Sequence, residues 1–154
     1  MSFRIFNWGS TSVQAFTTTA PVSYSPTLAS NTNVSATSFM WYREGQFMYI
    51  EGQIFFSGVG GAGEMTFTLP TTGSPTIDTN YLAGGTNASG NSSSIVGMVL
   101  WFNAGVARKP ISAHYKSTTT IGFYGTDLNV WSGSLAGNGD SLNFTVKVPI
   151  VGWS

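Results

Sequence analysis

Residues that could perform acid–base chemistry are few in this sequence. His114 is the only histidine, so a Ser-His-Asp triad has a single candidate base. It lies in the segment "ISAHYK", where it alternates with Ile111, Ala113 and Tyr115. Successive side chains of a strand point to opposite faces, so this pattern predicts that these three face inward and that His114 faces solvent.

Carboxylates are equally sparse. Glycoside hydrolysis needs two of them facing each other across a cleft. Acidic residues in predicted turns and loops ordinarily face water, and no spacing among the six selects a pair. The six are Glu44 and Asp140 in predicted turns, Asp78 in a predicted loop, and Glu51, Glu64 and Asp127. The sequence therefore predicts no catalytic residues and no enzyme activity.

Motifs for cofactors and metals are incomplete. Asn138 and Asp140 in "GNGD" have a spacing that calcium loops use, but the other EF-hand ligands are missing, which indicates a turn. The glycine-rich "GVGGAG" of residues 58–63 is not followed by a predicted helix, whose N-terminus a phosphate site would need. Cysteine is absent. We expect no cofactor and no metal.

Charge argues against nucleic acid and membranes as partners. The formal net charge is zero, and only Arg108 and Lys109 are adjacent basic residues, whereas DNA-binding surfaces cluster them. No apolar run approaches the roughly 18–20 residues of a membrane span. The N-terminus lacks the apolar core of a signal peptide, so we expect synthesis in a cytoplasm without cleavage. A surface with 8% charged residues suits a protein whose surface is largely covered by neighbours.

The elements that must position these residues are predicted to be strands. Aromatic residues make up 14% of the chain, and threonine is common, and both favour strands. Glycine-rich turns separate apolar runs at spacings typical of an antiparallel β-sandwich, jelly-roll-like or Greek-key, with about eight strands. We place this domain at residues 39–154 and an extended arm at residues 1–38, which are rich in small polar residues.

One strand is apolar on both faces. In "IVGMVLWF", Ile95, Val99 and Trp101 oppose a second set of large side chains. An antiparallel sheet normally turns one face to water, so the second set predicts a subunit interface in a homotrimer. The predicted interface residues are Val96, Met98, Leu100, Phe102 and, from the chain end, Trp153. The alternative is that the loop of residues 70–94 covers this strand.

Two further groups of aromatic residues suggest partners. Phe3, Ile5, Phe6 and Trp8 form an apolar cluster that we expect to dock onto another protein in extended form. Exposed tryptophans and tyrosines also serve as stacking platforms for sugars, although packing inside a core is the commoner fate of such residues. The candidates are Trp41, Tyr42, Trp101, Trp131 and Trp153.

Three segments resemble a β-sandwich domain that recurs in bacteriophage virion proteins. They are "WYREGQFMYIEGQIFF", "MTFTLPTTGSPTIDTN" and the closing "FTVKVPIVGWS", and the resemblance covers residues 33–154. The group includes C-terminal domains of tail-fibre and receptor-binding proteins. Tail fibres carry a long shaft or docking domain ahead of this module, whereas only about 38 residues precede it here, which suits a capsid decoration protein at least as well.

The resemblance implies a non-enzymatic virion structural protein that is displayed on the particle surface, attached by its N-terminal arm to other capsid or tail proteins. The alternative is a tail-associated receptor-binding or carbohydrate-binding module that recognises host glycans.

Overall fold

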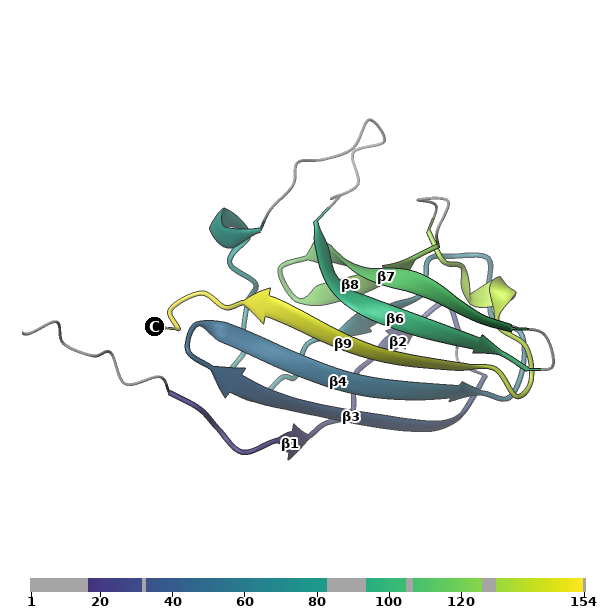
Figure 1. Ribbon diagram of the computed structural model, residues 1–154, viewed down its shortest axis with the longest axis horizontal. Coiled ribbons are helices and arrows are strands. Elements are labelled where there is room, and N and C mark those ends of the chain that lie inside the picture. The colour runs from purple at the N-terminus through teal and green to yellow at the C-terminus, as the bar shows by residue number, and fades with distance from the viewer. Residues whose placement is uncertain (1–16, 32, 83–93, 105–106, 126–129, 154) are drawn as a thin grey trace, which may run out of the picture.

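The computed structural model describes residues 17–31, 33–82, 94–104, 107–125 and 130–153 (Figure 1). Nine strands and two short 3₁₀ helices make up its regular elements, so the prediction of an all-β chain is confirmed. The strands are β1 (Val22–Ser23), β2 (Leu28–Ala29), β3 (Val34–Glu44), β4 (Phe47–Phe56), β5 (Thr66–Thr68), β6 (Ile95–Asn103), β7 (Ala107–Ser117), β8 (Thr120–Tyr124) and β9 (Ser141–Pro149). The helices are η1 (Thr79–Tyr81) and η2 (Gly133–Leu135). No helix in the described ranges is long and apolar enough to cross a membrane.

The strands form one antiparallel sheet in the order β1-β3-β4-β9-β6-β7-β8-β5-β2. The last strand, β9, lies between β4 and β6, as Figure 1 shows, and pairs with both. These two ladders join the halves of the molecule, so the described residues form a single sheet where the sequence predicted a sandwich of two. The pairing of β9 depends on contacts between distant parts of the chain, which strand periodicity does not specify.

The sheet curls into a half-barrel around its core. Phe39 on β3 packs against Phe67 on β5, with ring centroids 5.5 Å apart, although these strands lie near opposite ends of the strand order. Phe123 and Phe144 join the same aromatic cluster. The inner face of the sheet is therefore the buried one, and its opposite, outer face is left for other contacts.

Strand periodicity identifies the inner face of most strands correctly. Met48, Ile50, Ile54 and Phe56 on β4 are buried, as are Met65, Phe67 and Leu69 around β5 and Leu142, Phe144, Val146 and Val148 on β9. Ile111 and Ala113 on β7 are also buried, and Tyr115 packs against the core. A predicted strand around Trp131 is replaced, in its described part, by isolated bridges and η2.

The chain before residue 39 contributes to the sheet. The predicted domain boundary at residue 38 falls inside β3, which begins at Val34, and β1 and β2 pair with β3 and β5. Asn31 is fully buried and its side chain donates to the Gly133 carbonyl at 3.2 Å. The glycine-rich loop of residues 58–63 packs against this segment, because a Cβ at Gly60 would collide with Asn31. The arm residues Phe3, Ile5, Phe6 and Trp8 lie outside the described residues.

Candidate contact surface on the outer face of the sheet

The outer face is built by the residues that alternate with the core. On β4, for example, Ile50 and Ile54 point inward, so Glu51 and Gln53 point outward. We use "outer face" for the outward side chains of β3, β4, β9, β6 and β7. Their sequence positions are far apart, from Ser38 on β3 to Lys147 on β9, and the sheet register brings them together.

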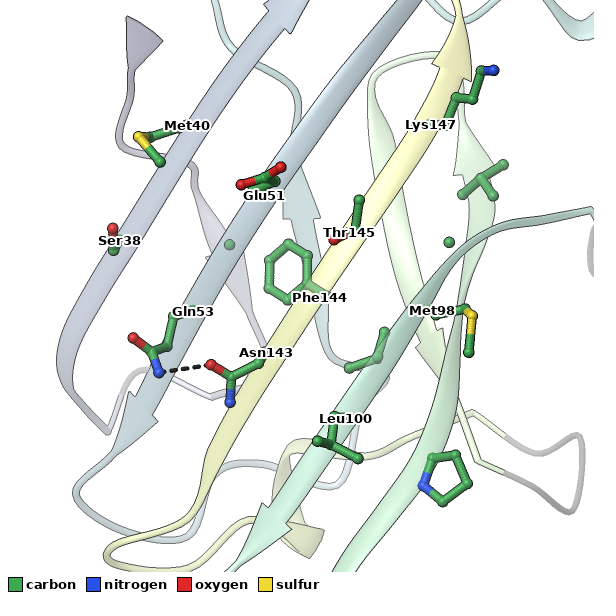
Figure 2. A pocket seen from close by; sticks show the side chains of 15 residues that line it. Ser38, Met40, Glu51, Gln53, Met98, Leu100, Asn143, Phe144, Thr145 and Lys147 are labelled. Carbon is green, nitrogen blue, oxygen red and sulfur yellow. Dashed lines mark hydrogen bonds between the residues drawn. The ribbon is translucent and has the colours of Figure 1, made fainter. Parts of the chain in front are cut away.

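Two rows of side chains cross these strands in register. Met40, Glu51, Thr145 and Met98 form one row, and Ser38, Gln53, Asn143, Leu100 and Pro110 form the other. Together with Lys147 they line an open hollow of about 850 Å³, which Figure 2 shows at close range. Amide, hydroxyl and charged groups from β4 and β9 occupy its centre, while methionine, leucine and proline side chains form its two sides.

Two glycines shape the hollow. A Cβ at Gly52 would overlap the ring of Phe144, its partner across the β4–β9 ladder, so the glycine leaves room for that ring in the floor (Figure 2). A Cβ at Gly97 would collide with the backbone of Thr145 and with Val146, so this glycine lets β6 approach β9 closely. Both positions therefore require glycine for packing.

The apolar members of the outer face are unusually exposed. Met98 is 79% exposed, and Met40, Leu100, Phe55 and Phe102 are each about 40% exposed. Isolated exposed apolar residues are ordinary, whereas a contiguous group across several strands indicates a contact surface.

The polar members of the hollow make few contacts. Gln53 Nε2 donates to Asn143 Oδ1 at 2.6 Å, which joins β4 to β9. The Lys147 amine lies over the rings of Phe47 and Tyr49, 4.2 and 5.1 Å from their centroids. Glu51 forms no ion pair with any residue in the described ranges, where Lys116–Glu64 is the only ion pair.

An aromatic pair borders the hollow beside Lys147. Tyr42 and Tyr49 are cross-strand partners, and their rings stack in parallel with centroids 5.0 Å apart. Desolvation raises the pKa of the Tyr42 hydroxyl, and the charge of Glu51 raises it further. The negative charge of Glu51 therefore acts across this part of the outer face.

The predicted interface residues have different positions. Met98, Leu100 and Phe102 are exposed on the outer face. Val96 is only 7% exposed, and its predicted place beside them is wrong, because the register shifts between Ile95 and Gly97. The same irregularity leaves Ile95 63% exposed, although it was predicted to share a face with Val99 and Trp101.

Trp153 is half-buried at one end of the curled sheet. It contacts Trp41, with ring centroids 6.2 Å apart, and the Arg43 guanidinium lies 4.8 Å from its ring. Trp101 and Trp131 are buried, so of the predicted sugar platforms these two are core residues. The subunit interface itself stays a prediction.

His114 is buried, and the prediction that it faces solvent is wrong. It is 4% exposed, its ring lies 4.3 Å from that of Tyr124, and its Nε2 is 2.7 Å from Ser112 Oγ. His114 does lie on the opposite face of β7 from Ile111 and Ala113, as the alternation predicts, but the Tyr124 ring covers it there. Burial against an aromatic ring gives His114 a packing role in the fold.

The carboxylates are dispersed, and three of them have structural contacts. Glu64 pairs with Lys116, and this bond raises the pKa of the lysine. Asp78 caps η1 by accepting from the Asn80 N–H at 3.0 Å. Glu44 is exposed near the β3–β4 turn. Asp127 lies outside the described residues.

Asp140 stabilises two turns. Its carboxylate accepts from the N–H groups of Ala104 and Gly137, at 2.8 and 2.9 Å, and from the Trp101 indole at 3.3 Å. The interpretation of "GNGD" as a turn is confirmed, since protein donors occupy both carboxylate oxygens. Among the described residues no group of three or more His, Asp or Glu side chains could hold a metal ion.

The sequence did not single out the centre of the hollow. Asn143, Thr145 and Lys147 are the polar half of the alternating pattern on β9, which was a signal for an outward face. Their association with Glu51 and Gln53 depends on the β4–β9 register. No protein-family model, curated protein or solved structure matches this chain.

Proposed function

We propose that this protein is a non-enzymatic structural component of a virion, displayed on the particle surface, and that it acts through its outer face as a contact surface. The observation that carries the proposal is the open hollow across five strands with exposed apolar sides. A contiguous group of exposed apolar side chains across several strands is typical of surfaces that bind another macromolecule.

The roles of the titratable residues support binding over catalysis. Asp140, Asp78 and Glu64 act as hydrogen-bond or ion-pair partners within the fold, and His114 packs against Tyr124. A catalytic acid and base need to converge on one cleft. The hollow contains a single carboxylate, that of Glu51, and its other charged group is Lys147.

The virion assignment is supported by the resemblance of the sequence motifs alone. In this proposal the segment with Phe3, Ile5, Phe6 and Trp8 attaches the chain to another capsid or tail protein by strand addition. Self-association through the outer face belongs to the same proposal, and the homotrimer predicted from the sequence and a two-fold pair of copies are two alternative forms of it. The facing halves of the curled sheet support a relationship to the jelly-roll-like sandwich, because Phe39 and Phe67 meet across the interior.

A second candidate function is recognition of a host glycan by the outer face. The observation that favours it is that the stacked pair Tyr42 and Tyr49 lies on the same face as the amides of Gln53 and Asn143, four residues along β4 from Gln53. Aromatic faces pack against sugar rings, and amides bond to sugar hydroxyls.

Two assays test the proposed function. Immunogold labelling with an antibody against this chain should decorate the surface of particles from cells that produce it. Polysaccharide-degradation assays should show no turnover. Label that stays with free protein, or turnover that is lost in a Glu51→Gln or His114→Ala variant, would contradict the proposal.

A glycan array separates the two candidates. Binding that is lost in Gln53→Ala and in Asn143→Ala, with the fold intact, would favour the glycan-binding function over the structural one.

A further inference from the structure

We propose that the outer face docks against the same face of a second copy of this chain, in a contact with two-fold symmetry. The inference names the partner of the outer face and rests on the proposed function only in treating that face as a contact surface. The structural reasons are the arrangement of its two charges, the position of Met98 and the absence of net charge.

Glu51 and Lys147 are diagonal neighbours on adjacent strands. Glu51 pairs with Thr145 in the β4–β9 register, two residues from Lys147 along β9. Diagonal neighbours lie about 7–8 Å apart, within reach of long side chains. The structure nevertheless places the Lys147 amine over Phe47, 4.2 Å from the ring centroid, and pairs neither charge within the described residues. Both charges therefore remain available to a partner.

Two opposite charges on one face suit a partner with the same face. When two copies meet face to face, the two-fold axis lies in the plane of contact, and residues on either side of it exchange places. An axis that passes between Glu51 and Lys147 sets each Glu51 opposite the other copy's Lys147. The contact then gains two ion pairs from a single arrangement. A partner other than a second copy would have to supply its own positive charge opposite Glu51 and its own negative charge opposite Lys147.

The same axis brings the most exposed apolar side chain to the hollow. In a flat projection with strands about 4.8 Å apart and residues about 3.4 Å apart along each strand, the axis runs close to Met98. Because a residue near the axis meets its own symmetry mate, Met98 of one copy lies opposite Met98 of the other, beside the β9–β6 boundary. Methionine is unbranched and adapts to irregular gaps, so the two 79% exposed side chains can pack against each other at the edge of the hollow next to Thr145.

Overall charge does not oppose this contact. Six basic and six acidic residues give a formal net charge of zero, so two copies do not repel each other at long range. Five strands about 4.8 Å apart, each with about four outward side chains, span roughly 20 by 20 Å, which is below the roughly 800 Å² per partner of a standard stable interface. We therefore expect a weak dimer in solution that is strengthened where copies are held close together, for example on a particle.

Sedimentation equilibrium of the full chain tests the contact. The wild type should form a concentration-dependent dimer. Glu51→Lys places like charges opposite each other, and so does Lys147→Glu, and each should weaken dimerisation by about tenfold or more. An equimolar mixture of these two variants should dimerise again, because each copy then meets its opposite charges. Lys109→Glu makes the same change in net charge as Lys147→Glu, at an exposed residue that alternates with the outward Pro110 on β7, and should have no effect.

Met98→Asp is an independent variant, since its exposed side chain makes unfolding a poor explanation for any lost dimer. A monomer at the highest attainable concentration, a trimer, or a mixture that fails to recover dimerisation would overturn the inference. The proposed function would survive these outcomes, because it is tested by the location of the chain on the particle.

Discussion

Gly52 offers a sensitive test of how the hollow is constructed. In Gly52→Ala the new Cβ would overlap the Phe144 ring, and even the ring's Cε1 atom would lie only 2.9 Å away. The ring has little room to retreat, because it is packed against Phe39, Phe67 and Phe123 with centroids 5.1–5.4 Å apart. The substitution should therefore strain the floor of the hollow and the core beneath it.

The expected magnitude follows from two opposing effects. Overpacking a filled core costs about 1–3 kcal/mol, and this site belongs at the upper end, since the clash involves a ring that neighbours hold on three sides. Replacing a strand glycine by alanine returns about 0.5–1 kcal/mol. We expect the free energy of unfolding to fall by about 2 kcal/mol. Gly58→Ala is the matched control, since its nearest neighbour atom would lie 3.5 Å away, and should change stability by less than about 0.5 kcal/mol.

A double-mutant cycle with Phe144→Leu identifies the cause. Leucine removes the ring atoms that the Cβ would overlap, so the two substitutions together should destabilise the protein by at least about 1 kcal/mol less than their sum. Urea unfolding of the four proteins supplies the measurement. Wild-type stability in Gly52→Ala, or additive effects in the cycle, would refute the packing described for the floor.

Three further predictions concern the rest of the chain. Asp140→Ala removes the acceptor for three donors and should lower the free energy of unfolding by about 3 kcal/mol or more. Asp78→Ala removes an exposed helix cap and should lower it by only about 1 kcal/mol. Equal losses for the two variants in urea unfolding would contradict the role of Asp140 in the turns. Burial raises the pKa of the Tyr24 hydroxyl above its ordinary 10.0, so its contribution to stability is present below about pH 10 and is lost as the pH rises further. Tyr24→Phe should thus lose less stability than the wild type between about pH 10 and pH 12 in the same assay, and parallel pH profiles would count against this. A chain lacking residues 1–16 should keep the circular dichroism of the wild type but fail to attach to particles, since the paired segment begins later; a truncated chain that still attaches would remove the docking role of the arm.

Strand faces were predictable from the sequence where the strands are regular. The alternation on β4 and β9 identified buried residues such as Ile50 and Val146, because a half-buried strand repeats every two residues. The prediction failed at Val96, where a register shift interrupts the alternation of β6. It also failed for the exposure of His114, because the Tyr124 ring that covers it comes from a different strand. The alternation of residues along one strand shows neither where the register shifts nor which ring from another strand covers a side chain.

The arrangement of strands and the hollow required tertiary structure. One sheet forms where two were predicted, because β9 pairs with β4 on one side and β6 on the other. The sequence did show a second set of large apolar side chains on β6, and Met98 and Leu100 of that set are exposed on the outer face. The row that joins Met98 to Glu51 depends on the same two ladders. A register between distant segments cannot be deduced from composition or periodicity.

The central claim, that the outer face is covered by a partner in the assembled particle, is most directly tested by methionine oxidation. Oxidation of methionine follows its accessibility, and the chain has internal references. Met98 and Met40 are exposed on the outer face, whereas Met48 and Met65 are fully buried. Mass spectrometry after peroxide treatment should show Met98 and Met40 oxidised in the free chain at low concentration and protected in the particle, with Met48 and Met65 protected in both. Equal oxidation of Met98 in the free chain and in the particle would contradict the claim.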